Sequence, residues 1–385
     1  GQLTLDWTDY DRIVTSALDG SAFEDRIAPQ AWPMPVDDRD PSPDLYGGWG
    51  SSAYGKMLNE YLRQCAAHFR QQGWLDRHFV WIPLPTDGLT GSPYSQFTWL
   101  GGMIARADRD LSLVCGLPAQ PMKAFGAVED HYQDLASWVG VWAPPASVAD
   151  SDALAAARKA GKRAWLQPDR PPYSGSLSFI APPVHARSLA WQAYRLGCSA
   201  LFLPQVTAWP DEGSVSEQAS AGVLLWPGKP YGLEAPVPSI RLKRILRGVQ
   251  DYEYLWLLER NQRPAVAELL SADLFAFGGT SCFGEHMLDS RPNGWVRDPS
   301  AWELARSLMA RELTAAIARA DRPASSQPAT PMAEPTGLAH QIDWRRHVEK
   351  VRRVHTLVEG VRVRLDPKQP ERPVAVRATV STFNA

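Results

Sequence analysis

The sequence predicts an α/β fold in which short buried strands alternate with helices between about residues 53 and 260. Stretches with apolar residues at helical spacing are separated by short continuous apolar runs that stop at proline or at polar residues. Neighbouring parallel strands need a long crossover connection, which is usually a helix. The alternation therefore predicts a parallel sheet with crossover helices, either a doubly wound sheet or a (β/α) barrel.

Each expected strand is one of the short apolar runs. The clearest are residues 78–82, 111–115, 138–142, 163–166 and 199–203, with residues 223–226 as one further strand. A closed barrel of this class needs eight strands. The early strands are therefore either cryptic within residues 1–50 or encoded upstream, which would leave the barrel incomplete at its N-terminus.

Helices are expected between these strands. The first covers residues 54–69, where apolar side chains recur three and four positions apart. Later ones cover residues 97–104, 153–160 and 184–196. Beyond the strands, residues 302–320 form an amphipathic helix, which predicts a helical extension.

The chain divides at a segment rich in proline, alanine, serine and threonine. We expect residues 1–321 to form the barrel with its C-terminal helices, residues 322–343 to form a linker, and residues 344–385 to begin a β-sandwich-like segment. Within this short C-terminal β segment, residues 361–365 and 374–380 alternate with period two, as strands do.

The composition is that of a globular protein and argues against several functions. Hydrophobic residues make up 44% of the chain and charged residues 21%, with a formal net charge of −2. Without a basic excess, nucleic acid is not an expected partner. No apolar run reaches the length of a membrane span. The four cysteines form no Cys-x-x-Cys motif and no Cys/His cluster, so the sequence does not support structural zinc or thioredoxin-type chemistry. The chain begins with Gly1 and without a signal peptide, and we expect a fragment or a processed chain.

Tryptophan is abundant, with 16 among the 385 residues. A flat indole packs well in a core and also stacks on the C–H face of a sugar ring. We assign most of these residues to packing. Four aromatic residues fall at or just past expected strand ends, where the sites of barrels gather, and are the expected stacking platforms: Trp142, Trp165, Tyr173 and Trp209.

The most informative segment covers residues 238–255. It predicts a helix that begins after Ser239 as the N-cap and buries one apolar stripe. Arg247 and Asp251 lie four positions apart and can pair on one face. Taken alone, the segment is an ordinary packed helix.

As a string, the same segment resembles the C-terminal signature of bacterial glycoside hydrolase family 123. There a Ser-x-Arg, an Arg-x-Gly and an Asp-Tyr-Glu-Tyr-Leu follow in order. Here Ser239–Arg241 and Asp251–Leu255 correspond to the first and the last, and between them Arg247 stands directly before Gly248. Two upstream segments are similar to the same family. Val223–Gly228 resembles its strand ending in aromatic-Pro-Gly, and Arg187–Tyr194 resembles its Arg-x-x-x-Trp helix.

The resemblance implies a TIM-like (β/α) barrel acting on N-acetylhexosamine-containing glycans, typically β-N-acetylgalactosaminides. The implied mechanism is retaining and substrate-assisted, an exception to the usual scheme of two catalytic carboxylates. One carboxylate orients the acetamido group, which attacks the anomeric carbon, while an adjacent glutamate protonates the leaving oxygen. The resemblance also implies an extracellular or cell-envelope location and no cofactor.

The expected acidic pair is missing. The family places Asp-Glu at the end of the strand that corresponds to residues 79–83, where this sequence has Pro83-Leu84. An acid catalyst needs a titratable group within hydrogen-bond reach of the glycosidic oxygen. Asp87 can serve if its loop bends back, and its alternative role is a turn residue in Thr-Asp-Gly. Glu129 and Asp130 form an adjacent acidic pair whose alternative role is a solvated helix start.

Further polar candidates lie in later loops. Asp211 and Glu212 follow a predicted strand and are expected as polar contacts to a sugar, with loop solvation as the alternative. His78, His131 and His185 are isolated, and we expect each to be solvated or satisfied within the core.

Three hypotheses remain open, because a fold does not settle a function. The first is an active glycoside hydrolase with relocated carboxylates. The second is a catalytically inactive relative that keeps an aromatic cleft and binds glycan. The third is a structural barrel in a cell-surface protein, with neighbouring β-sandwich domains as partners.

Overall fold

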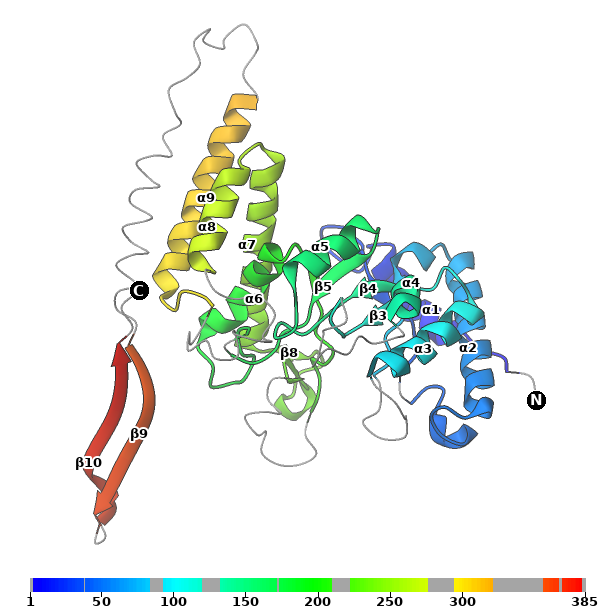
Figure 1. Ribbon diagram of the computed structural model, residues 1–385, viewed down its shortest axis with the longest axis horizontal. Helices are drawn as coiled ribbons and strands as arrows, with labels where there is room; N and C mark the ends of the chain where they lie inside the picture. The colour runs from blue at the N-terminus through cyan, green and yellow to red at the C-terminus, as the bar shows by residue number, and fades with distance from the viewer. Residues whose placement is uncertain are drawn as a thin grey trace, which may run out of the picture. The chain divides into compact units, whose positions relative to one another are not determined.

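The computed structural model describes most of the chain, in two compact units (Figure 1). The first unit comprises Gly1–Asp169, Leu196–Pro204 and Gly279–Asp289, and the second comprises Arg170–Arg195, Gln205–Gly278 and Ser290–Ala385. The described residues are 3–37, 39–83, 93–119, 132–171, 173–209, 222–275, 294–320, 356–366 and 369–382.

The described residues of the first unit include six short strands that pair in parallel. They are β1 (Trp32–Pro33), β2 (His78–Phe79), β3 (Leu113–Cys115), β4 (Val139–Trp142), β5 (Arg163–Leu166) and β6 (Ala200–Leu201). β1 pairs with β2, a parallel bridge between Val80 and Leu113 continues to β3, and β3 to β6 follow in order. A doubly wound sheet reverses its strand order, whereas a (β/α) barrel does not. The first unit is therefore a mixed α/β, barrel-like domain, and the described pairings run from β1 to β6 without joining those two strands to each other.

Helices precede β1 and fill the connections between the strands that follow. They are α1 (Thr8–Leu18), η1 (Pro43–Tyr46), α2 (Ser52–Gln71), η2 (Leu75–Arg77), α3 (Pro93–Ala107), α4 (Tyr132–Trp138) and α5 (Ser151–Lys159). Ser51 begins α2, because its hydroxyl accepts the backbone N–H of Tyr54 at 3.0 Å. Asp150 begins α5 in the same way, accepting from the N–H of Ala153 at 2.8 Å.

β1 is a cryptic early strand, one of the two outcomes that the sequence left open. Its hydrogen bonding to β2 continues one residue past the strand, because the backbone N–H of Met34 donates to the Phe79 carbonyl at 2.9 Å. Pro33 and Pro35 interrupt the apolar run around it. Proline is confined to strand edges and ends, so this composition does not predict a strand.

The pairing register gives the sheet two distinct faces. Val141 pairs with Arg163, and Trp142 pairs with Ala164. Successive side chains of a strand point to opposite faces. Trp165 therefore shares a face with Val141, while Trp142 lies on the other face.

The second unit is mainly helical. Its elements are α6 (Pro183–Arg195), β7 (Leu225–Trp226), η4 (Lys229–Tyr231), β8 (Val237–Pro238), α7 (Ile240–Arg260), α8 (Pro264–Leu274) and α9 (Pro299–Ala320). α6 to α9 lie side by side around a core in which Trp191, Leu255, Phe275 and Trp302 are buried (Figure 1). The strand expected at residues 223–226 does not extend the parallel sheet, because β7 pairs antiparallel with β8.

The C-terminal segment contains two long strands, β9 (Thr356–Asp366) and β10 (Gln369–Thr382), which pair antiparallel. They include both tail stretches expected as strands. The linker expected at residues 322–343 lies outside the described residues. Across the part of the chain that the structure describes, no helix combines the length and the apolar character needed to cross a membrane.

Candidate functional site

Four aromatic side chains gather near the carboxyl ends of β2, β5 and β6. This aromatic cluster consists of Phe79, Trp81, Trp165 and Phe202. Trp165 stacks on Phe202 with ring centroids 5.9 Å apart, and Phe79 meets Trp165 edge-on at 5.1 Å. Trp81 meets Phe202 edge-on at 5.5 Å and is only half-buried. Because sites of barrels form at the carboxyl ends of their strands, the cluster is the aromatic part of a candidate site.

Arg163 lies two residues before Trp165 on the same face and fixes the base of this cluster. Its guanidinium donates to the His78 carbonyl at 3.1 Å and to the Ser112 hydroxyl at 2.9 Å, and it lies 5.4 Å from the centroid of Trp165. Burial lowers the pKa of Arg163 from its ordinary value. The His78 ring accepts the backbone N–H of Ser112 at 2.9 Å, and burial lowers its pKa. His78 is thus satisfied within the core, as expected.

Gln167 is a polar side chain at the same ends of the strands. It follows β5 directly, and its backbone is fixed because its N–H donates to the Pro144 carbonyl at 3.1 Å. A Cβ placed on Gly116, which follows β3, would lie 3.6 Å from its side-chain oxygen and 3.8 Å from the carbonyl of Ala143. The Gln167 amide therefore lies over the ends of β3 and β4, where it can donate and accept hydrogen bonds.

The predicted platforms Trp142 and Trp165 occupy different faces of the sheet. Trp142 pairs with Cys115 and shares its face with Leu113, which packs against Gly101 of α3. Trp142 is only 2% exposed on this helix-covered face, so its indole packs in the core and offers no stacking face to a sugar. Trp165 belongs to the aromatic cluster but is 5% exposed, because both its neighbours in the cluster cover it.

Tyr173 and Trp209, the other two predicted platforms, belong to the second unit. Tyr173 is half-buried, and its carbonyl accepts a hydrogen bond from the Gln192 side chain at 2.7 Å. Trp209 is 46% exposed, and its indole N–H donates to the Leu225 carbonyl at 2.7 Å. Trp209 therefore has a fixed edge and an open face, as a stacking platform requires.

The predicted carboxylates lie outside the described residues, namely Asp87, Glu129, Asp130, Asp211 and Glu212. Pro83, which stands where the family's acidic pair is expected, is described and follows β2 by four residues. Among the described residues, no three histidine, cysteine, aspartate or glutamate side chains gather as metal ligands would.

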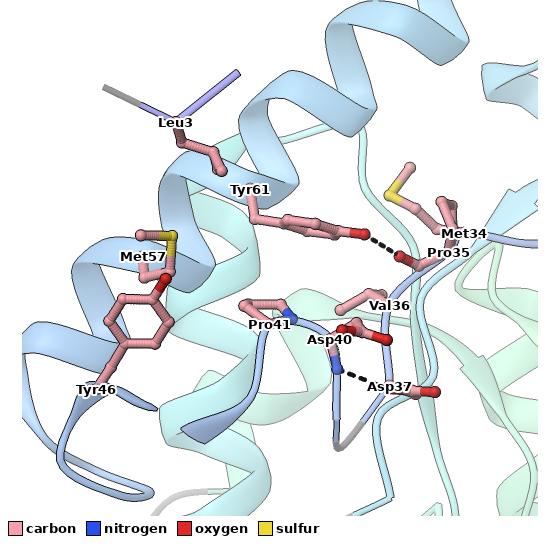
Figure 2. A pocket seen from close by; sticks show the side chains of 10 residues that line it. All are labelled: Leu3, Met34, Pro35, Val36, Asp37, Asp40, Pro41, Tyr46, Met57 and Tyr61. Carbon is pink, nitrogen blue, oxygen red and sulfur yellow. Dashed lines mark hydrogen bonds between the residues drawn. The ribbon is translucent and has the colours of Figure 1, made fainter. Parts of the chain in front are cut away.

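A cavity of about 510 Å³ opens just beyond β1 in the first unit (Figure 2). The loop after β1 forms one wall, and α2 with the end of η1 forms the other. Its lining residues are Leu3, Met34, Pro35, Val36, Asp37, Asp40, Pro41, Tyr46, Met57 and Tyr61. None of them was predicted as a site residue from the sequence.

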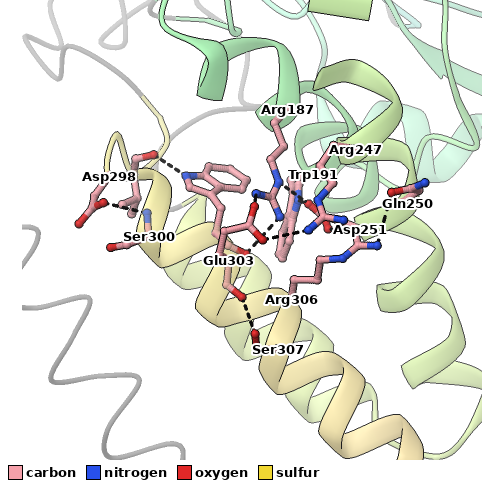
Figure 3. Close-up of polar contacts among 12 residues, drawn as sticks. Arg187, Trp191, Arg247, Gln250, Asp251, Asp298, Ser300, Glu303, Arg306 and Ser307 are labelled. Carbon is pink, nitrogen blue, oxygen red and sulfur yellow. Dashed lines mark hydrogen bonds and ion pairs between the residues drawn. The ribbon is translucent and has the colours of Figure 1, made fainter. Parts of the chain in front are cut away.

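The residues of the family signature form an ionic network in the second unit (Figure 3). Asp251 is completely buried. One of its oxygens accepts from the Arg187 guanidinium at 2.6 Å and from the Trp191 indole at 3.1 Å, and the other accepts from Arg306 at 2.6 Å. A single carboxylate on α7 thereby binds α6 and α9.

A second carboxylate extends this network. Glu303 accepts from Arg187 at 2.5 Å and from Arg247 at 2.9 Å. Burial alone would raise the pKa of Glu303, but the hydrogen bonds and charges of Arg247 and Arg187 outweigh it and hold the pKa below its ordinary value. The pairing of Arg247 with Asp251 expected from their spacing is wrong, because both find partners on α9 instead.

Three further signature residues, Ser239, Arg241 and Gly248, also have structural roles. Ser239 begins α7, since its hydroxyl accepts the N–H of Leu242 at 3.2 Å. Arg241 is buried and donates to the carbonyls of Leu177 at 2.5 Å and Val223 at 2.7 Å. A side chain on Gly248 would collide with the Arg187 backbone carbonyl, so α6 and α7 approach closely there. Arg241, Arg247 and Asp251 of the signature therefore hold elements of the second unit together.

Comparison with known proteins places the first two thirds of the chain in a known group. Residues 1–258 match the family model described as glycoside hydrolase 123, catalytic domain. No curated protein matches the chain.

Among solved structures, a family 123 glycoside hydrolase from Clostridium perfringens, solved to show the details of glycolipid glycan hydrolysis, matches with 12% identity and a TM-score of 0.43. The match covers 70% of this chain and 45% of that one. A putative glycerophosphoryl diester phosphodiesterase from Silicibacter pomeroyi matches with 14% identity and a TM-score of 0.28, covering 49% of this chain and 51% of that one. The chain thus spans about half the length of each.

Proposed function

Because this chain belongs to glycoside hydrolase family 123, we propose that it hydrolyses glycans that contain N-acetylhexosamine, with β-N-acetylgalactosaminides as the first class to test. The match of the family's catalytic-domain model to residues 1–258 carries this proposal. The aromatic cluster at the carboxyl ends of the strands supports it, because Trp81 offers a half-buried indole for the C–H face of a sugar.

The proposed mechanism is retaining and substrate-assisted. The oxygen of the substrate's acetamido group attacks the anomeric carbon, an acid protonates the leaving oxygen, and water then opens the cyclic intermediate. Pro83 has no proton to give, so the acid must come from another residue. We assign this role to Asp87 first, four residues further along, and to Glu129 or Asp130 second. Asp211, Glu212 and Trp209 are proposed as contacts to the sugar.

The test is the hydrolysis of aryl N-acetyl-β-galactosaminide and N-acetyl-β-glucosaminide by the wild type and by Asp87→Asn. We expect turnover of an N-acetylated substrate and a loss of about 10²-fold or more in kcat for Asp87→Asn, the usual contribution of a general acid. Substrates with better leaving groups should lose less, because their departing oxygen needs less protonation. Glu129→Gln and Asp130→Asn serve as matched variants. Full activity in all three carboxylate variants would contradict the assignment of the general acid to these residues.

A second candidate function is glycan binding without catalysis, by a barrel module of a secreted or envelope protein with β-sandwich neighbours. The observation that favours it is Pro83 at the position of the missing acidic pair. A glycan that binds the chain and is returned unchanged after prolonged incubation would support this second function over the first.

A further inference from the structure

The cavity beyond β1 has an apolar floor that is rigidly held. Met34 and Val36 are buried beneath it. The Tyr61 hydroxyl donates to the Pro35 carbonyl at 2.6 Å, which fixes the ring of Tyr61 along the cavity wall (Figure 2). Tyr46 and Met57 continue the same wall. A ligand here meets flat and apolar surfaces over one side of its body.

The opposite rim carries two carboxylates. Asp37 accepts the backbone N–H groups of Arg39 at 2.7 Å and Asp40 at 2.9 Å, which hold the loop in shape. Asp40 is exposed, and within the described part of the chain its carboxylate accepts no hydrogen bond. Burial raises the pKa of Tyr61. The charges of the nearby Cys65, Asp40 and Asp37 raise this pKa further, so both carboxylates act electrostatically on the Tyr61 ring across the cavity.

The charges of the lining restrict what can bind. None of the ten lining residues is a lysine, arginine or histidine, whereas two are aspartates. An anionic ligand would meet two like charges with no compensating cation. Ionised carboxylates only accept hydrogen bonds, so a ligand at this rim must supply O–H or N–H donors. A neutral sugar combines hydroxyl donors with an apolar C–H face, which matches both walls.

We propose that this cavity is a binding site for one neutral sugar residue of a glycan, with Asp40 and Asp37 accepting its hydroxyl groups and the rings of Tyr46 and Tyr61 facing its C–H side. The choice of a saccharide rests on the proposed function, whereas the site itself requires no catalysis. A volume of about 510 Å³ lies within the usual range for small-ligand sites.

The test uses three probes that share one ring and differ in charge: methyl β-galactoside, galactosamine and galacturonate. Binding to the intact chain is measured by saturation-transfer NMR titration for the wild type, Asp40→Asn and Tyr46→Ala. Asp76→Asn is the matched control, because Asp76 is an exposed aspartate of the first unit that does not line the cavity. We expect the neutral galactoside to bind, both cavity variants to weaken it about tenfold, and the control to leave it unchanged.

Three results would overturn the proposal. They are no binding of the neutral galactoside by the wild type, equal binding by Asp40→Asn, or a preference for galactosamine above about tenfold, which would mark a cation site. Binding is measured without turnover, so its outcome is separate from that of hydrolysis. A chain that binds galactoside through Asp40 but cleaves no aryl hexosaminide would retain this site and lose the proposed function.

Discussion

Asp251 joins three helices of the second unit through one buried carboxylate. Arg187 and Trp191 reach it from α6 and Arg306 from α9. We expect Asp251→Asn to lower the free energy of unfolding by about 3–5 kcal/mol, because Arg306 would lose its carboxylate partner and the buried Arg187 would keep only Glu303. Denaturant unfolding of the intact chain measures this change.

Glu303 is the control for that prediction. It belongs to the same network, but its side chain is 52% exposed. Water can replace much of its interaction, so Glu303→Gln should cost only about 1 kcal/mol or less. Equal costs for the two variants would mean that burial does not decide the contribution of these carboxylates.

Individual partners explain which site residues the sequence could and could not predict. Helical spacing suggested a local pair of Arg247 with Asp251, yet each residue pairs with a side chain more than fifty positions away. The role of Trp142 depended on which face of β4 it occupies, and only the register with β5 determines this. Trp81 lies near the end of the strand predicted at residues 78–82, and Gln167 directly follows the strand predicted at residues 163–166, and that position was the one signal available for them.

At the scale of elements, His185 on α6 makes the stability of the second unit depend on pH. Its Nδ1 accepts the backbone N–H of Ser176 at 3.2 Å, and its ring meets Trp295 edge-on. Burial, together with the charge of Arg297, lowers the pKa of His185 to about 4. The hydrogen bond from Ser176 requires the neutral ring, because a protonated Nδ1 cannot accept.

The sign of the pH dependence follows from this lowered pKa. Above pH 6.5 His185 is neutral in both states, and its contribution to stability is complete. As the pH falls from about 6.5 towards 4, the unfolded chain takes up a proton that the folded chain does not, so stability decreases. We expect a loss of about 2 kcal/mol between pH 7 and pH 5. Thermal unfolding across this range should show a weaker decline in His185→Asn, and parallel curves for both proteins would contradict the assignment.

Elements were predictable where a single local pattern decides them. The strands at β3, β4 and β5 and the helices α2, α5, α6 and α7 lie where apolar runs and helical spacing indicate them. β1 was not predicted, because it has only two residues, one of them Pro33, and such a segment carries almost no strand pattern. The antiparallel pairing of β7 was not predicted, because a short apolar run does not reveal whether its neighbour is parallel or antiparallel.

At the scale of the whole molecule, α9 marks the smallest stable C-terminal boundary. Trp302, Met309 and Leu313 of α9 are buried in the core of the second unit. We expect a chain that ends after Asp321 to unfold at the same temperature as the full chain, while a chain that ends before Pro299 should lose cooperative unfolding in the second unit. Calorimetry of both truncated proteins measures this. An equally stable shorter chain would contradict the role given to α9.

The parallel direction of the strands was a global property that the sequence predicted. Alternating strands and helices predicted a parallel sheet, and the structure extends it in chain order from β1 to β6. The choice between a doubly wound sheet and a barrel depends on which strands become neighbours. Non-local pairing decides this, and no window of the sequence contains it.

The network around Asp251 has a consequence for how the chain can change over generations. The interactions that make it recognisable as a family member stabilise its helices, whereas chemistry at the sugar would depend on loops after the strands. A substitution in the network destabilises the fold and is lost by selection, whereas a substitution in a catalytic loop leaves the protein folded. Related chains can therefore change or lose their reaction while they keep the family signature. The residues of the loops after the strands then show which of these changes a given chain has undergone.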